Sequence, residues 1–129
     1  MTWIVLFHDA FHEEFCSLDE ALQDELLAHT RLLAEFGPNL GRPTVDTLKG
    51  ARHSNMKELR FSWSGQVWRV AFAFDPQRQA ILLVGGNKGG RNQRRFYQQL
   101  VKLADDRYAV HLASLANPSQ EPSHGKKTR

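Results

Sequence analysis

The stretch that most constrains the fold is Met56–Gly90, in which apolar and polar residues alternate between turn signals. Ser64-Gly65 separates two alternating runs, and Asp75-Pro76 separates the second run from a third. Alternation with period two is typical of half-buried strands, and a two-residue turn with glycine joins antiparallel neighbours. The pattern therefore predicts a three-stranded antiparallel meander. Because its third run, Ala80–Val84, is continuously apolar, we expect a central strand buried on both faces.

The chain before the meander predicts one short strand and two helices. The apolar run WIVLF near the N-terminus is typical of a strand. Helical patterns follow over Asp9–Phe15, which Asp9 is expected to cap, and over Leu18–Phe36, as two helices or as one helix broken near Ser17. Ser17 and Glu20 have the spacing of a capping box and predict the start of the second helix.

The chain between these helices and the meander is irregular, and a third helix follows the meander. Pro38–His53 contains several turn-forming residues and predicts a connector, with Val45 and Leu48 expected to contact the core. Apolar residues at helical spacing predict a helix from Gln93 to about Leu115, with Asn92 as its N-cap.

Together these elements predict an α+β fold. Two N-terminal helices are expected to pack on one face of a small antiparallel sheet, followed by a C-terminal helix, and the other face is expected to stay free. We expect one domain over residues 1–116 and a disordered tail over 117–129, which is polar and rich in proline, serine and lysine.

Pairing across the Ser64-Gly65 turn divides the hairpin into two faces. In this register Arg60 lies directly across from Arg69, and side chains alternate between the faces. The apolar face, which the N-terminal helices are expected to cover, carries Leu59, Phe61, Trp63, Trp68, Val70, Phe72 and Phe74. The opposite face carries Glu58, Arg60, Ser62, Val67, Arg69 and Ala71.

The arginine pair needs a compensating group, because like charges directly opposite each other destabilise a sheet by up to about 1 kcal/mol. Glu58, diagonal to Arg69, would compensate on a solvated sheet face. An anionic ligand would also compensate, because each guanidinium group can donate two parallel hydrogen bonds to a phosphate. The hairpin by itself leaves both interpretations open.

Residues around the hairpin favour a nucleic-acid ligand. Lys57 precedes the arginine pair, and Lys88 lies in the loop GGNKGG after the central strand. The start of the last helix, where backbone amides favour anions, carries Arg91, Arg94 and Arg95. Tyr97 lies among them, and a tyrosine can stack on a base or transfer a proton.

The charge distribution agrees with a basic binding surface. Residues 1–30 hold seven acidic and no basic residues, a charge of −7, and residues 31–129 hold all 17 Lys and Arg and the other seven acids, a charge of +10. The two add up to the formal net charge of +3. We expect the acidic segment to solvate helix exteriors and the basic remainder to meet an anionic partner.

Other residues predict no metal or cofactor site. GGNKGG lacks the spacing of a phosphate-binding loop, and His8 and His12 are expected to be a surface pair. Cys16, the single cysteine, is expected in the core and fits a reducing, cytoplasmic compartment. The N-terminus resembles no signal peptide, and no apolar run reaches membrane-spanning length. Without a nucleophile–His–Asp set or a carboxylate pair, RNA cleavage would be metal-independent attack by a ribose 2′-hydroxyl.

Five short segments match a known pattern: Leu48-Lys49-Gly50, Lys57-Glu58-Leu59-Arg60, Arg69-Val70-Ala71-Phe72, Ile81-Leu82-Leu83 and Lys88. They resemble the RelE/ParE superfamily of bacterial toxins, and most of all its HigB-like, phage-derived branch. The resemblance covers about residues 3–115. It implies two N-terminal helices on an antiparallel sheet and a type II toxin that cleaves mRNA in the ribosomal A site. It also implies inhibition by a cognate helix-turn-helix antitoxin.

The resemblance also implies roles for the basic residues. The catalytic candidates are Arg60, Arg69, Lys88, Lys57 and Tyr97. Arg60 and Arg69 rank first, because Lys57 has the parity of the core face. The candidates for RNA binding are Arg91, Arg94, Arg95, Glu58 and His53, the last also as an acid or base.

Two other functions stay open. A ParE-like protein would inhibit gyrase, although such members generally lack the basic catalytic set. A non-catalytic module would bind RNA in a salt-sensitive manner without cleaving it.

Overall fold

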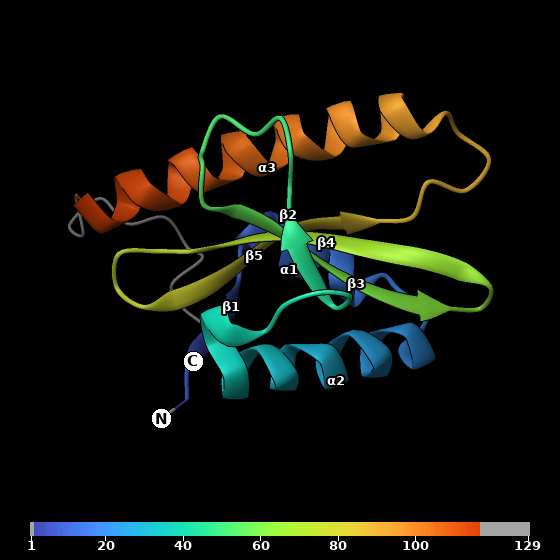
Figure 1. Ribbon diagram of the computed structural model, residues 1–129, viewed down its shortest axis with the longest axis horizontal. Coiled ribbons are helices and arrows are strands. Elements are labelled where there is room, and N and C mark those ends of the chain that lie inside the picture. The colour runs from blue at the N-terminus through green and yellow to red at the C-terminus, as the bar shows by residue number, and fades with distance from the viewer. Residues whose placement is uncertain (1, 117–129) are drawn as a thin grey trace.

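The computed structural model describes residues 2–116, which form three layers (Figure 1). A five-stranded sheet in the order β1-β5-β4-β3-β2 lies between helix α3 on one face and helices α1 and α2 on the other. The elements are β1 (Ile4–Phe7), α1 (Asp9–Cys16), α2 (Glu20–Phe36), the short 3₁₀ helix η1 (Gly37–Asn39), β2 (Val45–Thr47), β3 (Met56–Trp63), β4 (Gln66–Phe74), β5 (Gln79–Gly86) and α3 (Gln93–Ala116).

The order of elements confirms the predicted α+β architecture. β1 pairs with β5 in parallel, and all other neighbouring strands are antiparallel. β5 therefore lies between β1 and β4 and is the central strand that its apolar run predicts. The predicted tail over 117–129 lies outside the described residues.

The β3–β4 hairpin has the predicted register. Trp63 pairs with Gln66 and Arg60 pairs with Arg69 across the turn. Ser64 and Gly65 have φ angles of 54° and 77°. Two successive left-handed residues are what a type I′ turn requires, and this turn matches the right-handed twist of the flanking strands.

The apolar face of the hairpin meets α1 and α2, as predicted. Its buried members pack against apolar side chains of both helices, and these contacts form the first core cluster. The helices contribute Phe11, Phe15, Leu22, Leu26 and Leu33, and the hairpin contributes Leu59, Phe61, Trp68, Val70 and Phe72. The hairpin is thereby fixed to the N-terminal half of the chain.

The opposite face is not free, and the sequence prediction is wrong on this point. α3 packs across it and forms a second core cluster (Figure 1). The sheet contributes Met56, Ala71, Ala73, Ile81, Leu83 and Val84, and α3 contributes Phe96, Leu100, Ala104 and Tyr108. Only the end next to the hairpin turn stays uncovered, where Ser62 and Val67 are exposed.

The connector predicted to be irregular contains a short edge strand. β2 pairs with β3 through Val45 opposite Leu59, so the sheet gains a fifth strand that the sequence did not predict. Val45 and Leu48 are both buried, in agreement with the expected core contacts.

α1 and α3 start at Asp9 and Gln93 as predicted, whereas α2 starts two residues later than predicted and the N-caps of α1 and α2 differ. Asp19 caps α2 by accepting a hydrogen bond from the Ala21 amide at 2.9 Å, and Ser17 instead ends α1, so the predicted capping box is wrong. Aspartate and serine are both good N-cap residues, and spacing alone does not decide between them. His8 caps α1, through an acceptor nitrogen 3.2 Å from the Ala10 amide, where Asp9 was expected.

Cys16 and the histidine pair also correct the sequence predictions. Cys16 is exposed rather than buried, and its Sγ lies 3.9 Å from Nε2 of His12. His8 is buried, so the two histidines are not a surface pair. Over residues 2–116 no three His, Cys, Asp or Glu side chains group as metal ligands. No helix within the same range is long and apolar enough to cross a membrane.

Candidate functional site

The arginine pair lies at the uncovered end of the α3 face. Nη2 of Arg60 lies 3.5 Å from Oε2 of Glu58. The guanidinium group of Arg69 lies over the ring of Tyr97, at 5.4 Å from its centroid, and donates to the carbonyl of Val67 at 3.2 Å. The sequence predicted that Glu58 would compensate the charge of Arg69. This prediction is wrong, because Glu58 forms its ion pair with Arg60 and an aromatic ring faces Arg69.

Tyr97 and Glu58 join α3 to the arginine pair. The Tyr97 hydroxyl donates to Oε1 of Glu58 at 2.9 Å, and Glu58 is only 4% exposed. A carboxylate this deeply buried needs hydrogen-bond and charge partners, and Tyr97 and Arg60 supply them. The four side chains form one hydrogen-bonded and charged group, which we call the arginine cluster: Glu58, Arg60, Arg69 and Tyr97.

The arginine cluster favours a neutral phenol and charged guanidinium groups. Burial raises the pKa of Tyr97, the hydrogen bond and charge of Glu58 raise it further, and Arg69 and Arg60 oppose them only in part. Burial acts to lower the pKa of Arg60, but Glu58 and then Tyr97 outweigh it, so the net shift is upward. At neutral pH the cluster therefore presents two cations beside a protonated phenol.

Both arginines keep donors that nothing in residues 2–116 satisfies. The Nε atoms of Arg60 and Arg69 are buried and have no hydrogen-bond partner there. A buried donor without a partner costs about 1–3 kcal/mol, and an acceptor brought to it recovers part of that cost. The two guanidinium groups on facing strands are the feature of this surface that most favours an anion.

Lys57 lies on the other side of the sheet. It pairs with Phe72, and Phe72 belongs to the core cluster under α1 and α2. No irregularity interrupts the β3–β4 register between Met56 and Trp63, so nothing turns the side chain toward Arg60. The alternation of side chains along the strand, which is why Lys57 ranks below the arginines, is therefore confirmed: Lys57 lies on the face that α1 and α2 cover.

The loop after β5 is closed by one of the predicted RNA-binding arginines. Nη2 of Arg91 donates to the carbonyl of Asn87 at 2.7 Å, and its Nε donates to that of Lys88 at 3.2 Å. Its guanidinium group also lies 5.2 Å from the centroid of the Phe96 ring. Arg91 thus holds the loop that carries Lys88 against the start of α3.

The start of α3 places the other two arginines in solvent. Arg94 and Arg95 are exposed. Asn92 caps the helix as predicted, because its Oδ1 accepts from the Arg95 amide at 3.2 Å and its carbonyl accepts from the Phe96 amide.

His53 is engaged away from the arginine cluster. Its Nδ1 lies 2.9 Å from Oδ1 of Asp105, which also accepts the backbone amides of Arg52 and His53. Asp105 lies eight residues beyond Tyr97 in α3, a rise of about 12 Å along the helix. His53 therefore fixes the loop before β3 to α3, and the structure does not bring it to the arginines.

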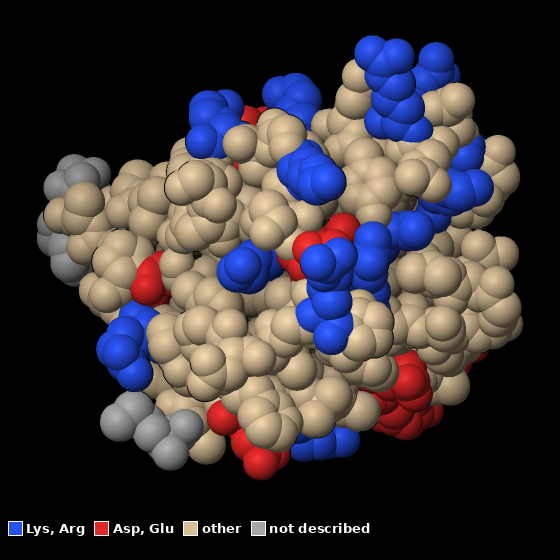
Figure 2. Space-filling model, in the orientation of Figure 1, with Lys and Arg blue, Asp and Glu red and all other residues tan. Residues whose placement is uncertain are grey.

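The surface around the cluster is basic on one side and acidic at the opposite edge. Figure 2 shows a band of Lys and Arg side chains across the middle of the molecule and up to the end where α3 begins, enclosing a few acidic atoms. Most of the other visible acidic side chains lie along the lower edge, near α2. This separation agrees with the −7 and +10 charges of the two sequence segments.

A pocket of about 410 Å³ opens beside Tyr97, between α3 and the loop that precedes β3. Its lining consists of Lys49, Gly50, Arg94, Tyr97, Gln98, Val101 and Lys102. Sequence reasoning assigned no site role to Lys49, Gln98 or Lys102. The available signal was the helical spacing of Arg94, Gln98 and Lys102, which places them along one side of α3.

Comparison with known families agrees with this architecture. The profile of the family described as "Phage derived protein Gp49-like (DUF891)" matches residues 13–109. The chain belongs to this family. The phage-derived branch that the sequence motifs resemble is thereby confirmed.

Two curated relatives come from Mycobacterium tuberculosis (strain ATCC 25618 / H37Rv). The chain is 44% identical over 111 residues to a protein named "Putative toxin HigB2", an alignment that covers 85% of this chain and 55% of the relative. It is 51% identical over 83 residues to "Putative toxin HigB3", covering 64% of this chain and 70% of the relative. The chain thus spans little more than half the length of HigB2.

A solved structure shares the fold at low sequence identity. A double arginine-to-alanine mutant of the E. coli toxin RelE, in the free state, superposes with a TM-score of 0.57 and 12% identity. The match covers 79% of this chain and 96% of the RelE chain. The RelE-like fold expected from the sequence is therefore confirmed.

Proposed function

We propose that this Gp49-like protein is the toxin of a type II toxin–antitoxin system and acts as a ribosome-dependent mRNA endoribonuclease. The observation that carries the proposal is the arginine cluster, in which Arg60 and Arg69 face each other with unsatisfied donors beside the phenol of Tyr97. The toxin names of HigB2 and HigB3 support the same assignment.

The cleavage that this cluster favours is transfer within the RNA strand. The ribose 2′-oxygen forms a bond to phosphorus while the bond from phosphorus to the 5′-oxygen breaks, leaving a 2′,3′-cyclic phosphate and a 5′-hydroxyl. Arg60 and Arg69 offset the negative charge that builds up on the phosphate oxygens. Because these side chains supply the positive charge, the proposed reaction is metal-independent.

In the proposed reaction Tyr97 transfers the proton. Its hydroxyl accepts the proton of the 2′-hydroxyl while it passes its own to Oε1 of Glu58, which lies 2.9 Å away. The departing 5′-oxygen takes up a proton from solvent, and the proton on Glu58 is returned to solvent, so that the protons balance. The pKa of Tyr97 is raised, so the phenol is neutral and has a proton to pass at neutral pH.

The proposal includes partners and a compartment. The substrate is mRNA in the ribosomal A site, the inhibitor is a cognate helix-turn-helix antitoxin, and the reaction takes place in the cytoplasm. Lys88 lies in the loop before α3, Arg94 and Arg95 are exposed at the start of α3, and these three side chains would contact RNA phosphates.

Brief induction of the protein in growing bacteria, followed by mapping of mRNA 5′ ends, tests the proposal. We expect new 5′ ends within translated regions and about a 100-fold or greater loss of cleavage in Arg69→Ala, because removing one charge-stabilising donor typically costs that much. Arg31→Ala, which removes an exposed arginine from α2, is the control and should cleave like the wild type.

Two outcomes would overturn the proposal. DNA breaks with intact mRNA would indicate gyrase inhibition, and RNA binding on ribosomes without new 5′ ends would indicate a non-catalytic module. Circular dichroism and thermal unfolding of Arg69→Ala confirm that a loss of cleavage does not come from a loss of fold.

A further inference from the structure

The pocket beside Tyr97 has the composition of a nucleotide site. Its floor combines the Val101 side chain, the Tyr97 ring and the bare backbone of Gly50, whereas Gln98 offers an amide. Its volume of about 410 Å³ lies within the range of small-molecule sites. An apolar floor with an amide on one wall suits the flat face and polar edge of a base.

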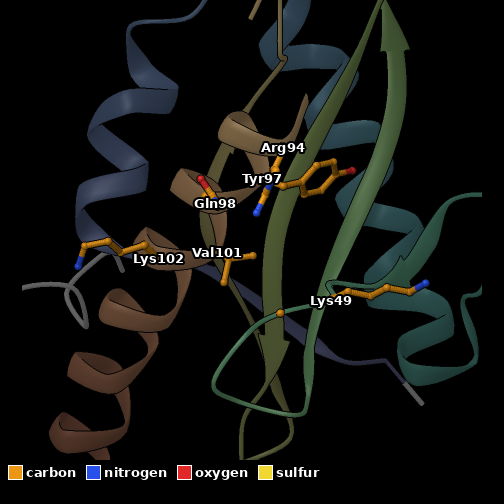
Figure 3. A pocket seen from close by; sticks show the side chains of 7 residues that line it. Lys49, Arg94, Tyr97, Gln98, Val101 and Lys102 are labelled. Carbon is orange, nitrogen blue, oxygen red and sulfur yellow. The ribbon is translucent and has the colours of Figure 1, made fainter. Parts of the chain in front are cut away.

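The rim of the pocket is cationic. Figure 3 shows Lys49 and Lys102 extending outward on opposite sides, so their stems line the pocket and their ammonium groups lie at its edge. Arg94 lies on α3 one turn before Tyr97 and Gln98. Of the three cations, Lys102 is paired with Asp106 at 3.2 Å, which leaves Lys49 and Arg94 as the principal donors to a phosphate.

The pocket keeps its shape because the loop on its far side is fixed to α3. Asp105, 5% exposed, accepts the Arg52 amide at 2.7 Å and the His53 amide at 3.2 Å. The His53 ring also packs edge-on against Tyr108, with centroids 4.9 Å apart. Buried contacts therefore fix Gly50 opposite Val101, so the pocket does not depend on a bound molecule for its shape.

Tyr97 belongs to both the pocket and the arginine cluster. Its hydroxyl reaches Glu58, while its side chain lines the pocket. A strand whose phosphate lies on Arg60 and Arg69 would thus have its neighbouring nucleotide at the pocket entrance. Tyr97 therefore joins the pocket to the arginine cluster.

We infer that this pocket binds one nucleotide of single-stranded RNA adjacent to the cleaved phosphate, with its base on Val101 and Tyr97 and its phosphate at Lys49 and Arg94. The inference rests on the proposed function for its orientation, because the cleaved phosphate is placed on the arginine cluster. The same chemistry could come from mRNA or from a ribosomal RNA nucleotide, and the experiment below separates the two sources.

Binding of a short single-stranded RNA with 2′-O-methyl riboses tests the base and phosphate contacts without cleavage. Val101→Trp fills the pocket, and we expect about a tenfold loss of affinity with an unchanged salt dependence, in the range of a lost base-stacking contact. Lys49→Ala removes one phosphate contact, so the slope of log affinity against log salt should fall by about 0.7. Arg31→Ala, on the opposite side of the sheet, should change neither quantity.

Crosslinking then locates the nucleotide and its source. Oligonucleotides with 4-thiouridine at successive positions should crosslink to α3 between Tyr97 and Lys102 from one position only. On translating ribosomes, a crosslink from labelled mRNA supports the inference in full, whereas a crosslink only from ribosomal RNA assigns the pocket to the ribosome and overturns its placement beside the cleaved phosphate.

The inference and the proposed function can fail separately. If Val101→Trp binds RNA like the wild type, the pocket is not a nucleotide site, whatever the cleavage assay shows. If the pocket variants lose RNA affinity but the wild type makes no new mRNA 5′ ends, the RNA site stands and the endoribonuclease assignment fails.

Discussion

The two faces of the sheet are covered by helices in different ways. Beneath α1 and α2 the hairpin is lined with large side chains such as Phe61, Trp68 and Phe72. Beneath α3 the same strand β4 carries Ala71 and Ala73, which are fully buried although they are small. Small residues let a helix approach a sheet closely. One face therefore supplies mainly stability, and the other brings a helix within hydrogen-bond reach of a charged strand.

The difference extends to the polar residues. On the α3 face the Tyr97 side chain packs against the second core cluster, and its hydroxyl belongs to the arginine cluster. If the faces divide stability from chemistry, substitutions on the first face should change unfolding and those at the end of the second should change cleavage.

The largest expected effect on stability comes from Phe72→Ala. Phe72 is fully buried under α1 and α2, so we expect the free energy of unfolding to fall by about 3–5 kcal/mol. Denaturant unfolding measures this change. Phe36→Ala, which removes an α2 ring that is 46% exposed, is the matched control and should cost less than about 1 kcal/mol. Equal losses in both variants would show that burial under α1 and α2 is not what makes Phe72 stabilising.

Tyr97→Phe should change cleavage more than it changes stability, which is the opposite of Phe72→Ala. We expect cleavage to fall about 100-fold or more, since the variant lacks the hydroxyl that is proposed to transfer the proton. Unfolding should change by about 1–3 kcal/mol, because buried Glu58 loses a donor. Single-turnover cleavage on ribosomes, with unfolding in parallel, measures both.

Tyr108→Phe supplies the control for Tyr97→Phe. Tyr108 lies on the same helix, and its hydroxyl contacts the Phe74 carbonyl and Asn55 rather than the arginine cluster. Cleavage should stay at the wild-type level in this variant. If both tyrosine variants lost activity equally, the effect would belong to the packing of α3 and not to the cluster.

Asp105→Asn tests the fixed loop on the α3 face through pH. Burial alone would raise the pKa of Asp105, but the amides of Arg52 and His53 and the His53 ring lower it below its usual value. Because the pKa of Asp105 is lowered in the folded state, its ionised form stabilises the fold at pH values above the unfolded-state pKa of about 3.9. This stabilisation is lost as the pH falls through the folded-state pKa. We expect the variant to be about 1–2 kcal/mol less stable at pH 7.

The stabilities of wild type and Asp105→Asn should converge as the pH falls below about 4. Denaturant unfolding at pH 7 and at pH 3 gives the comparison. A stability difference that persisted unchanged at pH 3 would show that the carboxylate charge is not what fixes the loop.

The smallest effect is expected for Cys16→Ser. Cys16 is exposed at the end of α1, so the free energy of unfolding should change by no more than about 0.5 kcal/mol. The rate of cleavage should stay close to that of the wild type. Thermal unfolding and ribosomal cleavage under reducing conditions check this. A large loss of either would show that the exterior of α1 takes part in function.

The hairpin and its arginine pair were predictable from sequence because they depend on local information. Alternation fixes which residues share a face, and the two-residue turn fixes the register, so Arg60 opposite Arg69 follows from counting. The central strand followed in the same way from its continuous apolar run.

The position of α3 was not predicted, although a signal was present. Met56, Ala71 and Ala73 alternate with the core-face residues and are apolar, which a free, solvated face would not favour. The bond between Tyr97 and Glu58 joins residues 39 positions apart, so it depends on where the helix lies and not on spacing. β2, with three residues, is too short for a periodic pattern to identify.

The parallel pairing of β1 with β5 also sets an order of assembly during synthesis. Ile4 pairs with Gln79, so the first strand waits until most of the described chain has emerged, and such distant pairing slows folding. Tyr97 emerges later still and joins residues of β3 only when α3 has formed. A nascent chain that ends before α3 therefore lacks Tyr97 and cannot form the hydrogen bond between Tyr97 and Glu58.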